Sequence, residues 1–266
     1  MARSALLNVM VQAALKAGKS LSRDFGEVQN LQVSVKGPSD FVSQADIKAE
    51  RVVREELMKA RPTYGFLGEE SEEIIGTDGA HRWIVDPLDG TTNFLHGIPQ
   101  FAVSIALERN GELVAGVIFN PATDELYSAE RGGGAFLNDR RIRVAARKVL
   151  SDCVIGCGVP HLGRGNHGKF LVELRHVMGE VAGVRRMGAA ALDLAYVAAG
   201  RLDGFWETGL SPWDMAAGLV LIREAGGYTS DMSGGAEMFS SGNVVAGNEY
   251  IHKALVETVN RPIPKL

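Results

Sequence analysis

Two acidic side chains stand three residues apart in the stretch WIVDPLDGTTNF, residues 83–94. Asp86 ends an apolar, strand-like run, and Asp89 follows after a short turn. Pro87 stiffens that turn, and Gly90 permits a bend that other residues disfavour, so both carboxylates can converge on one point. Carboxylates so close repel one another unless a proton or a cation lies between them. The spacing therefore indicates a cation site at a strand end, where α/β proteins usually place ligand-binding groups.

Helix capping is the alternative explanation for these acids. Asp89 or Thr91 could accept a backbone N–H at the start of a short helix near Thr92. Capping explains one acid of the pair but leaves the other unexplained. Asp214, in the first turn of another expected helix, has a similar alternative, because an acid is stabilised near a helix N-terminus.

Further acids extend the pattern. Glu69 and Glu70 follow the strand-like run GFLG, and Asp214 lies in SPWDMAAG. Oxygen ligands without a nearby Cys/His cluster favour hard cations, Mg²⁺ before Zn²⁺. A carboxylate site with several metal ions suits hydrolysis of phosphate esters, because one ion can activate water while another stabilises the leaving oxygen. Helices expected to begin at Thr91 and Met215 would direct backbone N–H groups toward the same phosphate.

The elements that must position these acids follow from periodicity and turn signals. Apolar residues recur at helical spacing over 3–25 and 45–60, and 33–43 reads as a turn or mobile loop flanked by short strands. Asn110-Gly111 between alternating apolar runs predicts a hairpin. The remaining strands are expected at 64–70, 82–86, 101–120, 125–138, 153–158, 203–208 and 243–248, and the remaining helices at 167–181, 189–200, 212–227 and 248–259. This order predicts a mixed, layered α/β or α+β protein whose sheets are covered by helices.

Length and composition limit the domain organisation and the classes of ligand that can be expected. The chain has 266 residues, enough for one large domain or two closely packed halves, here 1–145 and 146–266. A net charge of −4 without a long basic run argues against nucleic acid as the main ligand. No apolar stretch reaches the roughly 20 residues of a membrane helix, so no membrane partner is expected. We interpret the N-terminus as an amphipathic helix rather than a signal peptide, and Cys153 and Cys157 as buried thiols of a cytoplasmic protein.

The motifs together resemble those of a known family. WIVDPLDGTTNF, with GEES upstream and WDMAAG plus EAGG downstream, is similar to the inositol monophosphatase family over nearly the whole chain. The segment 185–218 is especially similar to the bacterial SuhB-type members. The resemblance implies a layered αβαβα sandwich of the type shared with fructose-1,6-bisphosphatase. It also implies a Mg²⁺-dependent phosphatase that acts on myo-inositol 1-phosphate and related small polyol phosphates, is sensitive to lithium and often forms a homodimer.

The resemblance also implies the metal ligands and the water. Two Mg²⁺ ions would be bound, with a third and weaker one near a mobile loop. The ligands of the two principal ions would be Glu69, Asp86, the backbone carbonyl of Leu88, Asp89 and Asp214. Glu69 and Thr91 would orient the attacking water, and Asp46 would hold Thr91.

Substrate contacts and supporting groups complete this implied site. Glu70 would support the metal ligands, and Lys36 and Asp40 match the mobile loop of the third ion. Amides of Gly90 and Thr91 would contact the phosphate. The substrate-binding set implied in this way is Glu69, Leu88, Asp89, Gly90, Thr91, Arg185, Ala190, Glu207 and Asp214.

Two alternatives stay open. Relatives hydrolyse fructose 1,6-bisphosphate, histidinol phosphate and 3′-phosphoadenosine 5′-phosphate, although only Arg185 and Arg186 stand out as extra basic residues for a bisphosphate. SuhB-type members are also associated with the transcription and ribosomal RNA processing machinery. A regulatory binding role is therefore the second hypothesis, and the acidic net charge favours a protein partner over RNA.

Overall fold

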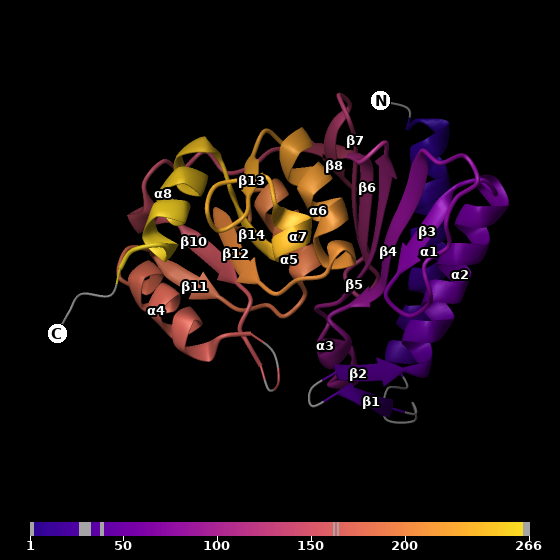
Figure 1. Ribbon diagram of the computed structural model, residues 1–266, viewed down its shortest axis with the longest axis horizontal. Helices are drawn as coiled ribbons and strands as arrows, with labels where there is room; N and C mark the ends of the chain where they lie inside the picture. Colours follow the sequence, from indigo (N-terminus) through magenta and orange to yellow (C-terminus); the bar gives the residue numbers. More distant parts are fainter. Residues whose placement is uncertain (1–2, 27–32, 38–39, 162, 164, 263–266) are drawn as a thin grey trace.

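The structure is a computed structural model that describes residues 3–26, 33–37, 40–161, 163 and 165–262. Helices and sheets alternate in five layers, which confirms the αβαβα sandwich (Figure 1). The helices are α1 (Ala5–Phe25), α2 (Gln44–Ala60), α3 (Thr91–Leu95), α4 (His167–Met178), α5 (Ala190–Ala198), α6 (Pro212–Glu224), α7 (Met238–Ser241) and α8 (Glu249–Val259). The outer layers are α1 with α2 and α4 with α8, while α5 and α6 lie between the two large sheets (Figure 1).

The first large sheet has seven strands in sequence order. Only β3 and β4 run parallel, and the other neighbours are antiparallel. The expected hairpin is confirmed, because Asn110 and Gly111 take the left-handed φ values of 53° and 78° that a tight turn requires. The strands are β3 (Gly65–Gly68), β4 (His81–Asp89), β5 (Ala102–Arg109), β6 (Glu112–Asn120), β7 (Glu125–Glu130), β8 (Gly134–Leu137) and β9 (Arg140–Ile142).

A bulge in β4 decides where the paired acids point. Asp86 lies opposite Ser104 of β5, but Asp89 lies opposite Ala102, so β4 holds one extra residue between them. In a regular strand, residues three apart face opposite sides of the sheet. The extra residue reverses that alternation, and we infer that it turns both carboxylates toward the same side.

The second large sheet has five strands in the order β11-β10-β12-β14-β13. Its central pair β10 and β12 is parallel, and β14 is antiparallel to both of its neighbours. The strands are β10 (Val154–Cys157), β11 (Gly183–Arg185), β12 (Gly204–Thr208), β13 (Tyr228–Ser230) and β14 (Asn243–Gly247). A separate pair, β1 (Val33–Gly37) and β2 (Asp40–Ser43), forms a small antiparallel sheet that leads into α2.

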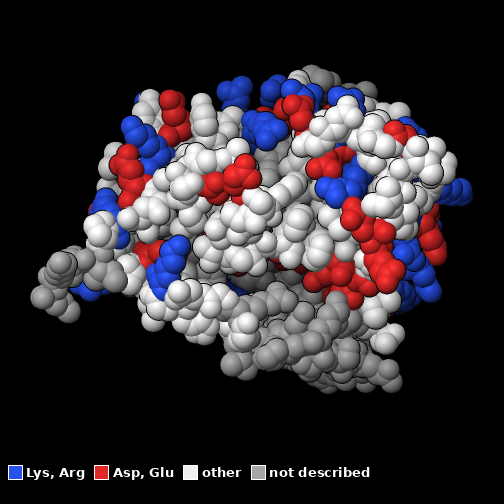
Figure 2. Space-filling model, in the orientation of Figure 1, with Lys and Arg blue, Asp and Glu red and all other residues white. Residues whose placement is uncertain are grey.

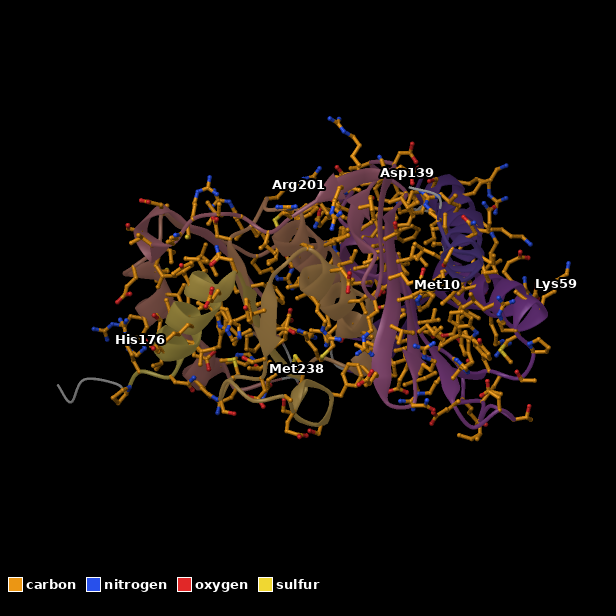
Figure 3. The ribbon with its side chains drawn as sticks, turned by 90° about the horizontal axis from the view of Figure 1, so that it is seen from above. Met10, Lys59, Asp139, His176, Arg201 and Met238 are labelled. Atoms are coloured by element: carbon orange, nitrogen blue, oxygen red, sulfur yellow. The ribbon has the colours of Figure 1, made fainter. Side chains whose placement is uncertain are left out.

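Three apolar clusters fill the spaces between the layers. One lies between α1, α2 and the seven-stranded sheet, where Met10 is fully buried (Figure 3). A second surrounds α5 and α6, and the third lies between the five-stranded sheet and α4 with α8. Because α6 touches both sheets, apolar and small residues cover almost its whole circumference. Within the described residues, no helix combines the length and apolar character needed to cross a bilayer.

Replacing a buried leucine should measure how much the outer helix layer contributes to stability. We expect Leu57→Ala, at a position of α2 that is 0% exposed, to lower the free energy of unfolding by about 2–5 kcal/mol. The matched change Leu171→Ala, at a position of α4 that is 62% exposed, should cost no more than about 0.5 kcal/mol. Urea denaturation followed by circular dichroism measures both values, and equal losses would contradict the assigned packing of α2.

Candidate active site

The site begins at the bulge of β4, where each acid binds a backbone amide. Asp86 Oδ1 accepts the N–H of Leu88 at 2.9 Å, which fixes the turn through Pro87. Asp89 Oδ2 accepts the N–H of Ala191 at 2.7 Å, in the first turn of α5. The two carboxylates are 2% and 9% exposed, respectively. Asp89 therefore joins the seven-stranded sheet to the helix layer that separates the two sheets.

Neither Asp89 nor Thr91 caps the short helix α3, so the capping alternative is wrong for that helix. The residue at the N-cap is Gly90, which has φ of 90° and no side chain to offer. The hydroxyl of Thr91 lies 3.1 Å from Asp46 Oδ2 and 3.0 Å from the carbonyl oxygen of Leu88, and can donate its proton to either. A Cβ on Gly90 would lie 2.8 Å from the carbonyl oxygen of Gln100, so both conformation and space require glycine.

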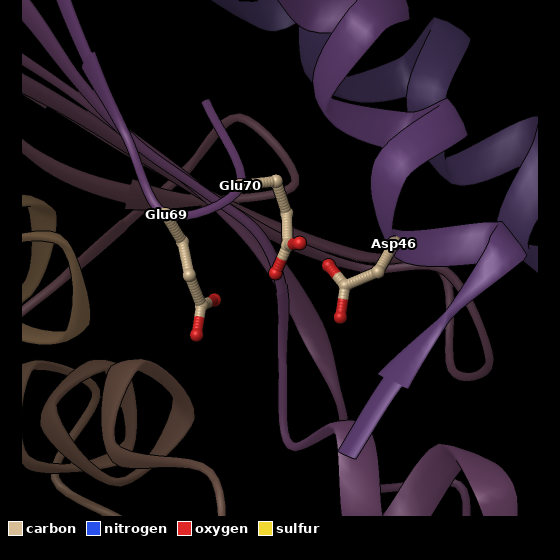
Figure 4. Close-up of side chains that lie close together, drawn as sticks. All are labelled: Asp46, Glu69 and Glu70. Atoms are coloured by element: carbon tan, nitrogen blue, oxygen red, sulfur yellow. The ribbon is translucent and has the colours of Figure 1, made fainter. Parts of the chain in front are cut away.

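Three further acids gather beside this turn. Oxygens of Asp46, Glu69 and Glu70 all lie within 4.8 Å of one another, close enough for one metal ion, and the side chains extend into the same space (Figure 4). Glu50, which is 3% exposed, accepts the N–H of Glu70 at 2.7 Å and so fixes the chain after β3. The sequence analysis did not identify Glu50, although its place four residues after Asp46 puts both acids on one face of α2.

Burial and like charge make this acid group unfavourable without a counter-charge. The pKa of Asp86 is raised well above its ordinary value, first by burial and then by the charges of Glu69 and Asp89. Burial also raises the pKa of Asp89, and the neighbouring charge of Asp214 adds to the rise. The amide of Ala191 opposes that shift by donating to the ionised carboxylate. A divalent cation would relieve the repulsion, because carboxylate oxygens are its preferred donors.

A cavity of about 180 Å³ opens beside these acids. It lies between the two halves of the fold and is lined by Glu69, Asp89, Gly90, Thr91, Thr92, Gly158, Val159, His161, Arg186, Gly188, Ala189, Ala190, Asp193, Glu207, Leu210 and Asp214. Seven residues of the expected site are therefore in its wall. Asp86 and Leu88 are buried at its base without lining it.

Other expected residues lie elsewhere. Arg185 is exposed at the end of β11, where its Nη1 donates to the carbonyl oxygen of Val184, while its neighbour Arg186 lines the cavity. Asp46 and Glu70 stand beside the cavity in the acid group described above. The side chains of Lys36 and Asp40 lie outside the described residues.

Asp214 satisfies both interpretations of its position. It is the third residue of α6, and its Oδ2 accepts the N–H of Ser211 at 2.7 Å in a reciprocal capping box. It also lines the cavity. The helix begins at Pro212, where the expected range 212–227 also begins, and the capping box occupies an N–H of its first turn. This helix end therefore offers fewer amides to a phosphate than the sequence indicated.

Asp193 and Gly158 are among the cavity residues that the expected site did not include. Asp193 lies in α5, whose other buried residues are apolar, and a single acid in such a helix was a usable signal. Gly158 follows β10, and a Cβ there would lie 1.8 Å from the carboxyl carbon of Glu207. Only glycine leaves room for that carboxyl group against the backbone.

The sequence and the structure were compared with those of known proteins. The sequence profile described as the inositol monophosphatase family matches residues 2–263. A Rhizobium meliloti (strain 1021) protein named inositol-1-monophosphatase is 79% identical over 264 residues, 99% of each chain. A Pseudomonas aeruginosa protein named Nus factor SuhB is 46% identical over 263 residues, 97% of each chain. The crystal structure of the extragenic suppressor protein suhB from Bartonella henselae superposes with a TM-score of 0.96 at 66% identity, covering 98% of this chain and 100% of that one.

The cavity acids should make the metal-free protein sensitive to pH. Burial raises the pKa of Glu207 from 4.5 to about 8, with smaller contributions from Asp214 and Asp89. The folded protein then holds a proton that the unfolded chain releases, so stability present at low pH is lost as the pH rises toward 8. Uptake of one proton can change the free energy of unfolding by at most about 1.4 kcal/mol per pH unit. We expect Glu207→Gln to lose less stability than the parent between pH 5 and pH 8.

Urea unfolding in a chelator at several pH values measures this slope. Glu72→Gln, at an exposed position outside the cavity, is the matched control and should keep the parent's slope. Equal slopes for the parent and Glu207→Gln would show that Glu207 does not hold the proton.

Proposed function

The chain belongs to the inositol monophosphatase family, and from this we propose that it is a Mg²⁺-dependent phosphomonoesterase acting on myo-inositol 1-phosphate and related small polyol phosphates. The observation that carries the proposal is the gathering of acids from β4, α2, α6 and the segment after β3 around one cavity. These acids are far apart in the sequence, and their mutual repulsion needs a counter-charge.

The donor set fits hard divalent ions. Carboxylates of Asp46, Glu69 and Glu70 already lie within reach of one ion, and the charges on Glu69 and Asp89 both act on Asp86. We propose that two or three Mg²⁺ ions bind here, held principally by Glu69, Asp86, the carbonyl of Leu88, Asp89 and Asp214. The bound ions would polarise the phosphate and lower the pKa of a water molecule.

The chain's own groups would position that water. Thr91 Oγ1 can donate to Asp46 Oδ2, which leaves its lone pairs to accept a hydrogen bond from water. Glu69 lines the cavity and provides a carboxylate that would take one proton from the water as its oxygen attacks phosphorus. Asp46 thus fixes the donor direction of Thr91, and Glu50 fixes the backbone beside Glu69 through the amide of Glu70.

The rest of the cavity would hold the phosphate and the alcohol. Gly90 and Thr91 would supply amides to phosphate oxygens, because the left-handed Gly90 turns the chain sharply at that point. Ala190, Glu207 and Asp214 would contact the polyol. Arg185 was expected there too, but Arg186 is the arginine that reaches the cavity, and we propose that it takes this position.

Other expectations complete the proposal. We propose a single domain over residues 1–266, a cytoplasmic location, a homodimer and inhibition by lithium, all from the resemblance to the family. The same chemistry on fructose 1,6-bisphosphate, histidinol phosphate or 3′-phosphoadenosine 5′-phosphate is the alternative. A cavity of about 180 Å³ with one arginine in its wall favours a compact monophosphate over a bisphosphate.

Removing one proposed ligand charge tests the activity. With Mg²⁺ the protein should release phosphate from inositol 1-phosphate, at a higher kcat/KM than from the three alternative substrates. Asp89→Asn should lose more than the roughly 100-fold that changes around a metal site typically cost. Asp124→Asn, at an exposed position with φ of 54° that asparagine also adopts, is the matched control. Undiminished turnover in Asp89→Asn would remove the metal argument.

A regulatory binding role is the second candidate. Relatives from Pseudomonas aeruginosa and Escherichia coli, 46% and 43% identical, are named Nus factor SuhB. We propose as an alternative that this chain binds a protein of the transcription or ribosomal RNA processing machinery. The face shown in Figure 2 carries positive and negative side chains interspersed, which suits a protein partner better than RNA.

A catalytically dead variant separates the two roles. If catalysis is the essential role, Asp89→Asn expressed at parental level will fail to rescue the phenotype of a strain lacking the gene. Growth is measured beside strains that express the parent and Asp124→Asn. Full rescue by Asp89→Asn would favour the binding role instead.

A further inference from the structure

Asp193 is a buried acid in the cavity wall that the proposed chemistry does not use. It lies in α5, and its N–H donates to Ala189 at 3.0 Å, in the same turn whose Ala191 amide binds Asp89. The residue is 1% exposed, yet it is part of the cavity wall. Asp193 therefore lies two residues along α5 from the amide that binds Asp89, a proposed metal ligand.

One oxygen of this carboxyl group has no partner. Asp193 Oδ1 is buried and makes no hydrogen bond within the described part of the chain. A Cβ on Gly156 would lie 3.5 Å from it, an ordinary contact distance, so the oxygen lies close to β10 without a donor there. A buried acceptor left unsatisfied destabilises the folded state, and a donor from a bound ligand would relieve that loss. This observation points to a ligand rather than to the packing of the helix.

The neighbours of Asp193 define what that ligand would be. Glu207 and Asp89 both raise the pKa of Asp193 after burial itself, and Arg186 opposes the rise. Asp89 and Arg186 also act on Glu207, and both carboxyl groups line the same cavity as Arg186. The positive charge of Arg186 disfavours another cation at this end. A hydroxyl group suits this end of the cavity, because a hydroxyl can donate a hydrogen bond to a carboxyl oxygen and accept one from a guanidinium.

We propose that Asp193 is a specificity-determining residue that accepts a hydrogen bond from a hydroxyl of the polyol, on the far side of the cavity from the reacting phosphate. The inference rests on the proposed phosphatase function. It identifies a hydroxyl group as the part of the substrate that this end of the cavity recognises. Glu207 and Arg186 flank that hydroxyl, while the phosphate lies against Gly90 and the metal site. Sites built to pair a hydroxyl strongly reject analogues that lack it, because the buried acceptor is then left unpaired.

The test compares two esters with the same six-membered ring. Inositol 1-phosphate carries the ring hydroxyls, and cyclohexyl phosphate lacks them. We expect the ratio of their kcat/KM values to fall about tenfold in Asp193→Leu, which removes every hydrogen-bonding atom at nearly constant volume. Asp193→Asn keeps a carbonyl acceptor at the same position and should lower the ratio less, by about threefold.

Asp203→Asn is the matched control. Asp203 is 2% exposed, pairs with Arg147 at 3.0 Å and lies outside the cavity wall, so its change should lower stability and leave the ratio alone. A ratio within twofold of the parent's in Asp193→Leu would overturn the proposal and assign Asp193 a structural role. If circular dichroism shows that the leucine variant does not fold, the ratio in Asp193→Asn decides in the same way. A parent protein that hydrolyses neither ester would overturn the phosphatase function, and with it this inference.

Discussion

The repulsion between buried carboxylates is the constraint on which the rest of the site depends. Asp86 and Asp89 lie at the two ends of one bulge in β4. The charges of Glu69 and Asp214 add to the repulsion between them. A folded chain tolerates such a group only when something outside the carboxylates compensates for it. Part of that compensation is internal, from the amides of Leu88 and Ala191, and the remainder is the role we assign to divalent ions.

The layered fold brings these charges together because ends of elements from several layers meet there. β4 ends at the acids, α2 has Asp46 in its first turn, and α5 and α6 begin at the cavity. Asn93 of α3 strengthens the connection, since its Nδ2 lies 3.0 Å from the carbonyl oxygen of Met187 and 2.8 Å from that of Gln100. Much of the cavity wall is therefore built on element ends that hydrogen bonds to backbone groups hold in place.

Much of the fold and of the acid group could be predicted from the sequence alone. Long helices and the hairpin at Asn110-Gly111 carry periodicity or turn chemistry that local physics determines. Four short elements, β9, β11, β13 and α7, have only three or four residues, too few for a period to show, and they form because neighbouring elements supply their partners. Likewise Pro87 indicated a turn after Asp86, but the bond from Asp89 to α5 rather than to α3 depends on a contact between residues 102 positions apart. Asp193 was missed, and Arg185 was expected in the place that Arg186 takes, for the same reason, since only the packed tertiary structure shows which side chains face the cavity.

The bond between Asp89 and the amide of Ala191 has a consequence for how this sequence can change. One oxygen of that carboxylate tethers a helix, and the group as a whole faces the cavity. A chain that abandoned metal-dependent chemistry could not simply discard the acid, because α5 would lose the acceptor for its first turn. A relative that lost the activity would then keep this aspartate, because the residue still stabilises the start of α5.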